Sequence, residues 1–331
     1  MRARRVVVAV ALAACATAAA REKGNPMLTL GKPVVLEQVQ ADLVAVHRDG
    51  RRWALALAGL VEVRDAAGKV VASDEGEPVQ SLRFSADGRA VLASPGVIDL
   101  ATGKARALPP ALSKTLNRTM PGTELTGSAF TPDGKRMVVA ARGRPRKGAG
   151  DGEAGATLLL LDGKTRALSR SLWAGDARLD CVATDGRSAA AADVDVVLAG
   201  IAPARAARVL EGDESKVRSL AFSPDGKTLA ASDASGSVTL WEVKSGRRIA
   251  RFAAHAGDTV VAFHPSLPVL VTGADGEVRL WSLGDAPARL SSASVPGEVR
   301  SLAFAPAGDR LLAATWSNDP VVLSIPVAHV P

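Results

Sequence analysis

Apolar and polar positions alternate in a unit that recurs along most of this chain. The stretch SLAFSPDGKTLAAS (219–232) consists of an apolar run, a Pro-Asp-Gly turn and a second apolar run. Near-copies are SLRFSADGRAVLAS (81–94), SAFTPDGKRMVVAA (128–141) and SLAFAPAGDRLLAA (301–314). Because Gly accepts a positive φ and Asp hydrogen-bonds the backbone of its own turn, each unit predicts two strands joined by a tight turn.

Seven copies of this unit emerge when the chain is aligned on the residue three positions before each Asp-Gly or its equivalent. The copies are spaced 38, 46, 52, 40, 41 and 41 residues apart, and five of the six Phe residues fall on the aligned position. The aligned residues are Val46, Phe84, Phe130, Val182, Phe222, Phe263 and Phe304. A period of about 40 residues indicates a repeat architecture.

Each copy continues with a third apolar run, such as SVTLWEV or EVRLWSL, a polar turn and a short fourth run. Four short strands per repeat, with no helical periodicity after the first residues, are typical of a β-propeller blade. The sequence therefore predicts an all-β, seven-bladed β-propeller of four-stranded antiparallel blades. An additional strand-like segment, MLTLGKPVVL (27–36), is expected to complete the last blade and close the ring.

The dipeptide Leu-Trp at 240–241 and 280–281 stands where WD-repeat propellers carry their Trp-Asp, and the chain resembles that family over residues 27–331. Glu242 and Ser282 follow the two Trp residues, so the second half of the dipeptide differs from the family pattern. The resemblance is strongest in residues 216–283. It implies a buried structural tetrad of hydrogen-bonded side chains, formed by His255, Thr272, Asp275 and Trp281.

The first 20 residues have the character of an export signal. Arg2, Arg4 and Arg5 precede a nine-residue apolar run, which is too short to span a bilayer. The following LAAC, ending at Cys15, resembles a bacterial lipobox and implies lipidation of that residue. We expect a signal peptide (1–14), a lipidated tether (15–26) and the propeller (27–331), exported to the bacterial envelope and anchored in the outer membrane if there is one, periplasmic or surface-facing. The alternative is an ordinary signal cut after ATAAA (16–20).

Charge and composition narrow the possible partners. The chain has 41 basic and 34 acidic residues, a net charge of +7, and three of the positive charges lie in the leader. Without a dense basic stripe, nucleic acid is not an expected partner. The four histidines are scattered and Cys181 stands alone in the body, so no metal site or cofactor is expected. Cys181 is expected to be a buried, unreactive thiol.

Residues that break the repeat are the candidates for binding. Alignment places Trp173 and Trp316 in connections on one face of the ring, and the longest interruption (142–155) belongs to the same face. Trp and Arg are enriched in binding hot spots, although both Trp residues could also fold back onto the blades. The candidate binding face therefore consists of Trp173, Trp316, Arg142, Arg144, Arg146 and Lys147.

Together these features predict a membrane-tethered, non-catalytic scaffold that mediates protein–protein interaction in the bacterial envelope. Its partners are expected to be proteins, with the membrane engaged through the lipid anchor. Two alternatives remain open at this stage: a component of a Tol-like envelope assembly, and a propeller enzyme, either a hydrolase or quinone-dependent, with its site in the central channel.

Overall fold

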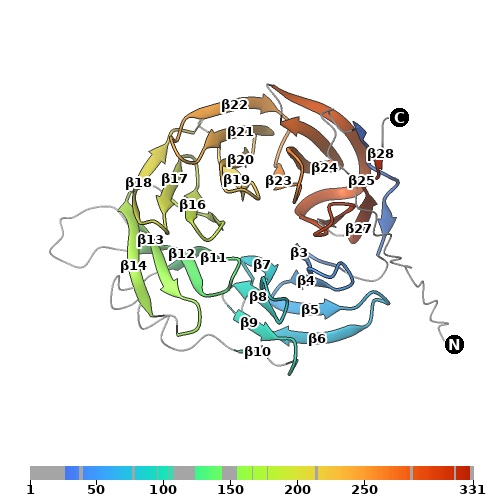
Figure 1. Cartoon of the computed structure of the whole chain (residues 1–331), viewed down its shortest axis with the longest axis horizontal. Helices are drawn as coiled ribbons and strands as arrows, with labels where there is room; N and C mark the ends of the chain where they lie inside the picture. The colour runs from blue at the N-terminus through green and yellow to red at the C-terminus, as the bar shows by residue number, and fades with distance from the viewer. Residues whose placement is uncertain are drawn as a thin grey trace.

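The computed structural model describes residues 27–36, 40–76, 79–94, 96–103, 105–106, 124–143, 155–165, 167–176, 178–212, 215–283, 286–316 and 318–328. Over these ranges the chain forms β-strands around a central opening (Figure 1). None of the segments described forms a helix that is long and apolar enough to cross a membrane. The expected signal peptide and tether, Cys15 included, lie outside the described residues and stay predictions.

Five antiparallel sheets of four strands each stand side by side around the opening. The first contains β3 (Leu43–Val46), β4 (Trp53–Leu57), β5 (Leu60–Arg64) and β6 (Val70–Glu75). The second contains β7 (Ser81–Phe84), β8 (Ala90–Ser94), β9 (Gly96–Asp99) and β10 (Ala105–Arg106). The third contains β11 (Glu124–Phe130), β12 (Arg136–Gly143), β13 (Gly155–Asp162) and β14 (Leu168–Gly175). The fourth contains β15 (Cys181–Thr184), β16 (Ser188–Ala192), β17 (Val196–Gly200) and β18 (Arg205–Leu210). The fifth contains β19 (Val217–Phe222), β20 (Thr228–Asp233), β21 (Ser237–Glu242) and β22 (Arg248–Ala253).

The last two repeats share a single six-stranded sheet, ordered β2-β27-β26-β25-β24-β23. Its strands are β2 (Val34–Val35), β23 (Val260–Phe263), β24 (Val269–Leu283), β25 (Pro287–Phe304), β26 (Arg310–Thr315) and β27 (Asn318–Ser324). Counted as hydrogen-bonded sheets, the ring therefore has six blades, five of four strands and one of six, and the prediction of seven separate four-stranded blades is wrong.

The physical reason for this difference lies in two short connections. Gly276 and Gly297 turn the chain with positive φ values of 71° and 75°, so few residues leave the strand conformation there. As a result β25 pairs with β24 through its first part, where Asp275 lies opposite Glu298, and with β26 through its second part. The hydrogen-bonded ladder therefore continues from one repeat into the next.

The inner strands of each blade are apolar on both faces because each blade is covered by a neighbour on either side. In β12 and β13, for example, Val138, Val139, Leu158 and Leu159 point alternately to opposite faces and are all buried. Side chains of adjacent blades form clusters between the sheets, such as the one that joins Ala190 and Val196 of one blade to Leu229 and Trp241 of the next. This two-sided burial explains why these strands appear as continuous apolar runs.

The tight turns between the first and second strands are held by their own side chains. Thr131 Oγ1 donates to Asp133 Oδ1 at 2.6 Å, and Gly134 N donates to Thr131 O at 2.8 Å. Gly134 has a φ of +68°, which a residue with a Cβ adopts only at a cost. The recurring Asp-Gly is therefore a requirement of the turn geometry.

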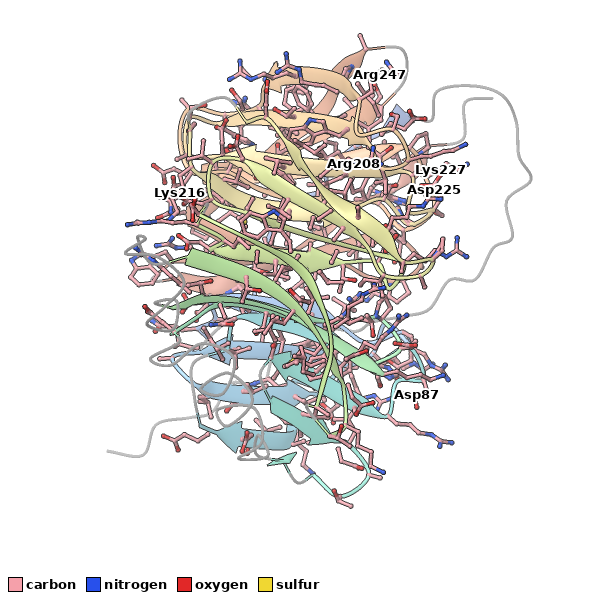
Figure 2. The ribbon with its side chains drawn as sticks, turned by 90° about the vertical axis from the view of Figure 1, so that its left-hand side faces the viewer. Asp87, Arg208, Lys216, Asp225, Lys227 and Arg247 are labelled. Atoms are coloured by element: carbon pink, nitrogen blue, oxygen red, sulfur yellow. The ribbon has the colours of Figure 1, made fainter. Side chains whose placement is uncertain are left out.

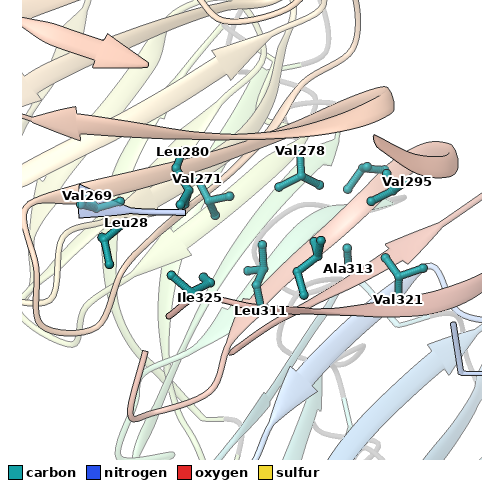
Figure 3. Close-up of a cluster of buried hydrophobic side chains, with 12 residues drawn as sticks. Leu28, Val269, Val271, Val278, Leu280, Val295, Leu311, Ala313, Val321 and Ile325 are labelled. Carbon is teal, nitrogen blue, oxygen red and sulfur yellow. The ribbon is translucent and has the colours of Figure 1, made fainter. Parts of the chain in front are cut away.

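The two ends of the described chain meet at the six-stranded blade. β2 pairs antiparallel with β27, with Val34 opposite Val322, and β1 (Met27–Leu28) pairs with β28 (Val327–Ala328). Leu28 is buried in the large apolar cluster of this blade, close to Ile325 and the strands β24 to β27 (Figure 3). The pairing of β2 with the last long strand joins the beginning and the end of the ring.

Candidate functional site: the mouth of the central channel

The first strands of the blades begin at one face of the ring, which we call the mouth face. It includes residues 254–259, residues 298–300 and Trp316. The opposite face, formed by the turns between first and second strands, such as residues 131–135 and 223–227, is called the turn face. The inner strands of each blade are buried, so exposed polar side chains gather on these two faces and on the outer strands.

Three members of the implied structural tetrad are brought together between neighbouring blades at the mouth face. Thr272, fully buried in β24, accepts a hydrogen bond at its Oγ1 from Trp281 Nε1 at 2.9 Å. The same oxygen lies 2.8 Å from His255 Nε2. Phe252 packs against Trp281 with ring centroids 4.7 Å apart. Because the hydroxyl is enclosed and engaged by two ring nitrogens, this arrangement serves packing between the blades.

The fourth predicted member, Asp275, does not join this group. It is exposed, and no hydrogen bond links it to His255 among the residues described. Arg279 instead donates to Ala254 O and, at 2.6 Å, to Glu277 Oε2. Burial of the imidazole, together with the nearby Arg279 guanidinium, lowers the pKa of His255 to about 4, so the ring is neutral at pH 7.

A cavity of about 390 Å³ occupies the channel behind the mouth. Its wall is formed by the first strands of successive blades and includes polar side chains from several of them. These are Gln80, Thr126, Asp180, Arg218 and Arg300. Cys181 also lines it, and burial raises the pKa of its thiol to about 12, which keeps the sulfur protonated.

Ion pairs join neighbouring blades around this opening. Arg218 Nη2 lies 2.8 Å from Asp258 Oδ2, and Lys216 Nζ lies 2.5 Å from Asp180 Oδ2. The hydrogen bond to Asp180 raises the pKa of Lys216. The rim therefore presents both signs of charge in fixed positions, which suits recognition of a partner with a complementary pattern.

Trp316 follows β26 and is the most exposed large apolar side chain in the described chain, at 51%. The Arg300 guanidinium lies over its ring, 4.7 Å from the centroid. Arg300 is also paired with Glu298 at 3.2 Å, and Trp316 N donates to Glu298 O at 2.7 Å. These contacts hold an aromatic surface at the edge of the central cavity.

The other predicted binding residues are placed differently. Trp173 lies within β14 and is half-buried against the apolar cluster of two neighbouring blades, whereas the alignment had placed it in the connection after that strand. Arg142 lies near the end of β12, opposite Ala156. Arg144, Arg146 and Lys147 lie outside the described residues. The structure thus leaves Trp316 and Arg142 at strand ends and Trp173 in a packing position.

Sequence reasoning missed Arg300 and the role of two histidines. His264 is buried, and its Nε2 lies 3.2 Å from Gly308 O of the next turn. His47 is also buried and lies 3.0 Å from Gly88 O. Each histidine directly follows the aligned repeat residue, Val46 or Phe263. This shared position could have indicated that the two histidines play the same structural role. Within the described ranges, no group of three or more His, Cys, Asp or Glu side chains is placed to hold a metal ion.

The strands and their connections form a β-propeller with a polar rim around its central channel. Comparison with known proteins adds that residues 205–242 and 246–282 match the family model WD40 (WD domain, G-beta repeat). These two segments are similar to WD40 repeats and make up less than a quarter of the chain.

Relatives are similar over limited stretches. An uncharacterized WD repeat-containing protein of a Synechocystis species is 30% identical over 156 residues, which cover 46% of this chain and 42% of that protein. Telomerase protein component 1 of Rattus norvegicus is 41% identical over 75 residues, 22% of this chain and 3% of that protein. Activating molecule in BECN1-regulated autophagy protein 1A of Danio rerio is 36% identical over 100 residues, 29% of this chain and 8% of that protein. The chain thus spans less than half of the length of each of these relatives.

Solved structures show the same fold at low identity. The crystal structure of the RRP9 WD40 repeats superposes with a TM-score of 0.73 at 14% identity, covering 90% of this chain and all of that one. The structure of U3-55K gives a TM-score of 0.70 at 15% identity, covering 89% of this chain and 98% of that one. These likenesses establish the propeller architecture.

Proposed function

We propose that this protein is a lipid-anchored binding platform of the bacterial envelope, which captures a protein partner on its mouth face without catalysing a reaction. The observation that carries the proposal is the position of Trp316 at the rim of the 390 Å³ cavity, half-exposed beneath Arg300. An exposed Trp held by an Arg is a typical energetic centre of a protein interface.

Anchoring is the second part of the proposal. It is supported by the leader, in which Arg2, Arg4 and Arg5, a short apolar run and LAAC precede the rest of the chain. The resemblance of LAAC to a lipobox makes Cys15 the acylated residue.

The rim geometry suggests how a partner would be held. An aromatic or aliphatic side chain of the partner would cover the exposed face of Trp316, while polar groups would meet the paired charges of Arg218 and Asp258. Trp173 and Arg142 extend the proposed face toward the β11–β14 blade. Because Trp173 also packs between blades, its contribution to binding is best tested with the conservative Trp173→Phe.

In-cell crosslinking followed by affinity purification and mass spectrometry tests the proposal. The wild-type protein should capture a defined set of envelope proteins, and Trp316→Ala should lose part of that set. Val71→Ala, which shortens another exposed apolar side chain far from the mouth, is the matched control and should retain it. If Trp316→Ala captures every partner at wild-type levels, the mouth face is not the binding surface.

Fractionation tests the anchor separately. The wild-type protein should sediment with membranes, and Cys15→Ser should move it to the soluble fraction. An unchanged distribution would refute lipidation at this residue and leave the mouth-face proposal standing.

A further inference from the structure

A second cavity, of about 360 Å³, lies between two neighbouring blades on the side of the ring opposite the mouth. It is lined by the turn after β15, the connection from β17 to β18, the turn after β19 and the connection from β21 to β22. In Figure 2, Arg208, Asp225 and Lys227 lie toward one edge of the ring and Lys216 of the mouth face lies at the other. We call this cavity the turn-face groove.

Four basic side chains surround the groove: Arg187, Arg205, Lys227 and Lys244, all exposed. Lys227 Nζ lies 3.5 Å from Asp225 Oδ2 and forms an ion pair with it. In the part of the chain that the structure describes, Arg187, Arg205 and Lys244 form no ion pair. Three cations are therefore available to a ligand.

The carboxylates in the groove are already engaged by their own turns. Asp185 Oδ1 accepts from Ser188 N at 2.6 Å, and Asp225 Oδ1 accepts from Ser223 Oγ at 2.7 Å. The Ser223 bond is the largest contribution that lowers the pKa of Asp225. Glu242 Oε2 accepts from Ser245 Oγ at 2.5 Å. These acceptors are satisfied, whereas most of the donors around them are not.

The basic surface continues beyond the groove along the outer strands. Arg208 Nη1 donates to Ser245 O at 2.5 Å and so ties β18 to the connection of the next blade, beside Arg247. Two exposed apolar side chains lie in the same outer strands, Val209 in β18 and Ile249 in β22, at 50% and 47%. The outer strand β6 on another part of the ring carries Asp74 and Glu75 instead.

We propose that the turn-face groove binds an acidic segment of a protein partner, with carboxylates on Arg187, Arg205 and Lys244 and an apolar side chain on Val209 or Ile249. The groove is a concave space between two blades, which suits an extended peptide better than a flat lipid surface. The three carboxylates inside it oppose a uniform polyanion such as nucleic acid, whereas a peptide can place its acidic groups only where the cations are.

This surface is separate from the mouth face, so the two proposals succeed or fail independently. A fluorescent peptide of four Glu-Gly-Leu units serves as the probe, with Lys-Gly-Leu as its counterpart, in fluorescence anisotropy with the purified protein. We expect the acidic peptide to bind, the basic one not to bind, and affinity to fall as salt is raised from 50 to 200 mM.

Charge reversal locates the site. Arg205→Glu combined with Lys244→Glu should lower the affinity of the protein for the acidic peptide by at least tenfold. Arg89→Glu combined with Lys135→Glu makes the same charge change elsewhere on the turn face and should change affinity less than twofold. Trp316→Ala should leave peptide affinity unchanged. Circular dichroism and thermal melting should be the same for all variants, since these side chains are exposed.

Three results would overturn the proposal. The first is no measurable binding of the acidic peptide at 50 mM salt. The second is an equal loss of affinity in the groove variant and its control, which would show a general charge effect. The third is tighter binding of phosphatidylglycerol vesicles or a 20-nucleotide single-stranded DNA that is weakened by the same groove variant, which would assign the groove to a membrane or to nucleic acid.

Discussion

On the turn face, hydroxyl side chains bond within their own turns, whereas on the mouth face charged side chains bond across neighbouring blades. Ser85, Thr131 and Ser223 each donate to the Asp two residues later, at 2.6 to 2.7 Å. At the mouth, Arg218 reaches Asp258 of the next blade. The hydroxyl–Asp pairs of the turn face recur because the tight turn of a blade needs them, whereas the Arg218–Asp258 pair belongs to one position in the ring.

Each face also has residues that depart from this pattern. On the turn face, His47 and His264 do reach the following turn, each in a buried contact with a Gly carbonyl and a T-shaped contact with a Phe ring. On the mouth face, Thr272 is buried like any repeat residue, although its hydrogen-bonded group occurs in one place. Burial, more than location, thus marks the structural residues, and exposure marks Trp316 and the groove cations.

The largest effect is expected from a repeat residue. Phe130, fully buried between blades, changed to Ala should lower the free energy of unfolding by about 3–5 kcal/mol, because a cavity replaces the ring. Urea unfolding followed by Trp fluorescence measures this. A loss below about 1 kcal/mol would mean that the repeated aromatic is not a core requirement, and Val71→Ala on the surface provides the baseline.

The hydrogen-bonded group at Thr272 should give an intermediate effect. Thr272→Val keeps the shape and removes the hydroxyl, so the Trp281 indole N–H and the His255 ring lose their partner. The expected cost is about 1–3 kcal/mol. Thr272→Ser retains the oxygen and should lose less in the same unfolding experiment. Equal losses for Val and Ser would indicate that packing of the methyl group, and not the hydrogen bonds, matters here.

A smaller effect concerns pH. Because burial lowers the pKa of His255 to about 4 in the folded state, the unfolded chain binds this proton first as pH falls below about 6.5. The contribution of the neutral His255 ring to the free energy of unfolding should therefore be complete above pH 6.5 and decline toward pH 4. At pH 5 the expected loss is about 1 kcal/mol, after allowing for partial exposure of the ring. The pKa of Asp49, lowered to about 2, affects stability only at more acidic pH.

The comparison with His255→Gln isolates this contribution, because burial also lowers the pKa of His264 in both proteins. The difference in unfolding free energy between wild type and variant should move against the wild type as pH is lowered from 7 to 5. A difference that is constant with pH would show that His255 titrates normally in the folded protein.

Much of the architecture could be predicted from the sequence. The seven aligned residues all lie in strands that run into a tight turn, from Val46 in β3 to Phe304 in β25, because a two-sided apolar pattern and Asp-Gly turns are local signals. The number of sheets could not be predicted from this pattern. It depends on whether hydrogen bonding continues through the connections at Gly276 and Gly297, and that depends on backbone geometry rather than on hydrophobicity.

The candidate sites were harder to predict for a related reason. Trp316 could be recognised because it breaks the repeat, but Trp173 was misplaced because an alignment offset of a few residues moves a side chain from a connection into a strand. Arg300 has a counterpart in Arg218, so nothing in the sequence distinguishes it until Trp316 is found beneath it. The four basic side chains around the groove belong to four separate segments and come together only through the fold.

Isothermal titration of the purified protein with its captured partner tests the central claim most directly. Trp316→Ala should raise the Kd for the partner at least tenfold, which corresponds to a loss of about 1.4 kcal/mol or more of binding free energy. The same variant should leave the unfolding free energy within about 0.5 kcal/mol of wild type. That combination would define Trp316 as a binding residue that the fold does not need. A Kd within twofold of wild type for this variant would contradict the assignment of the mouth face as the binding surface.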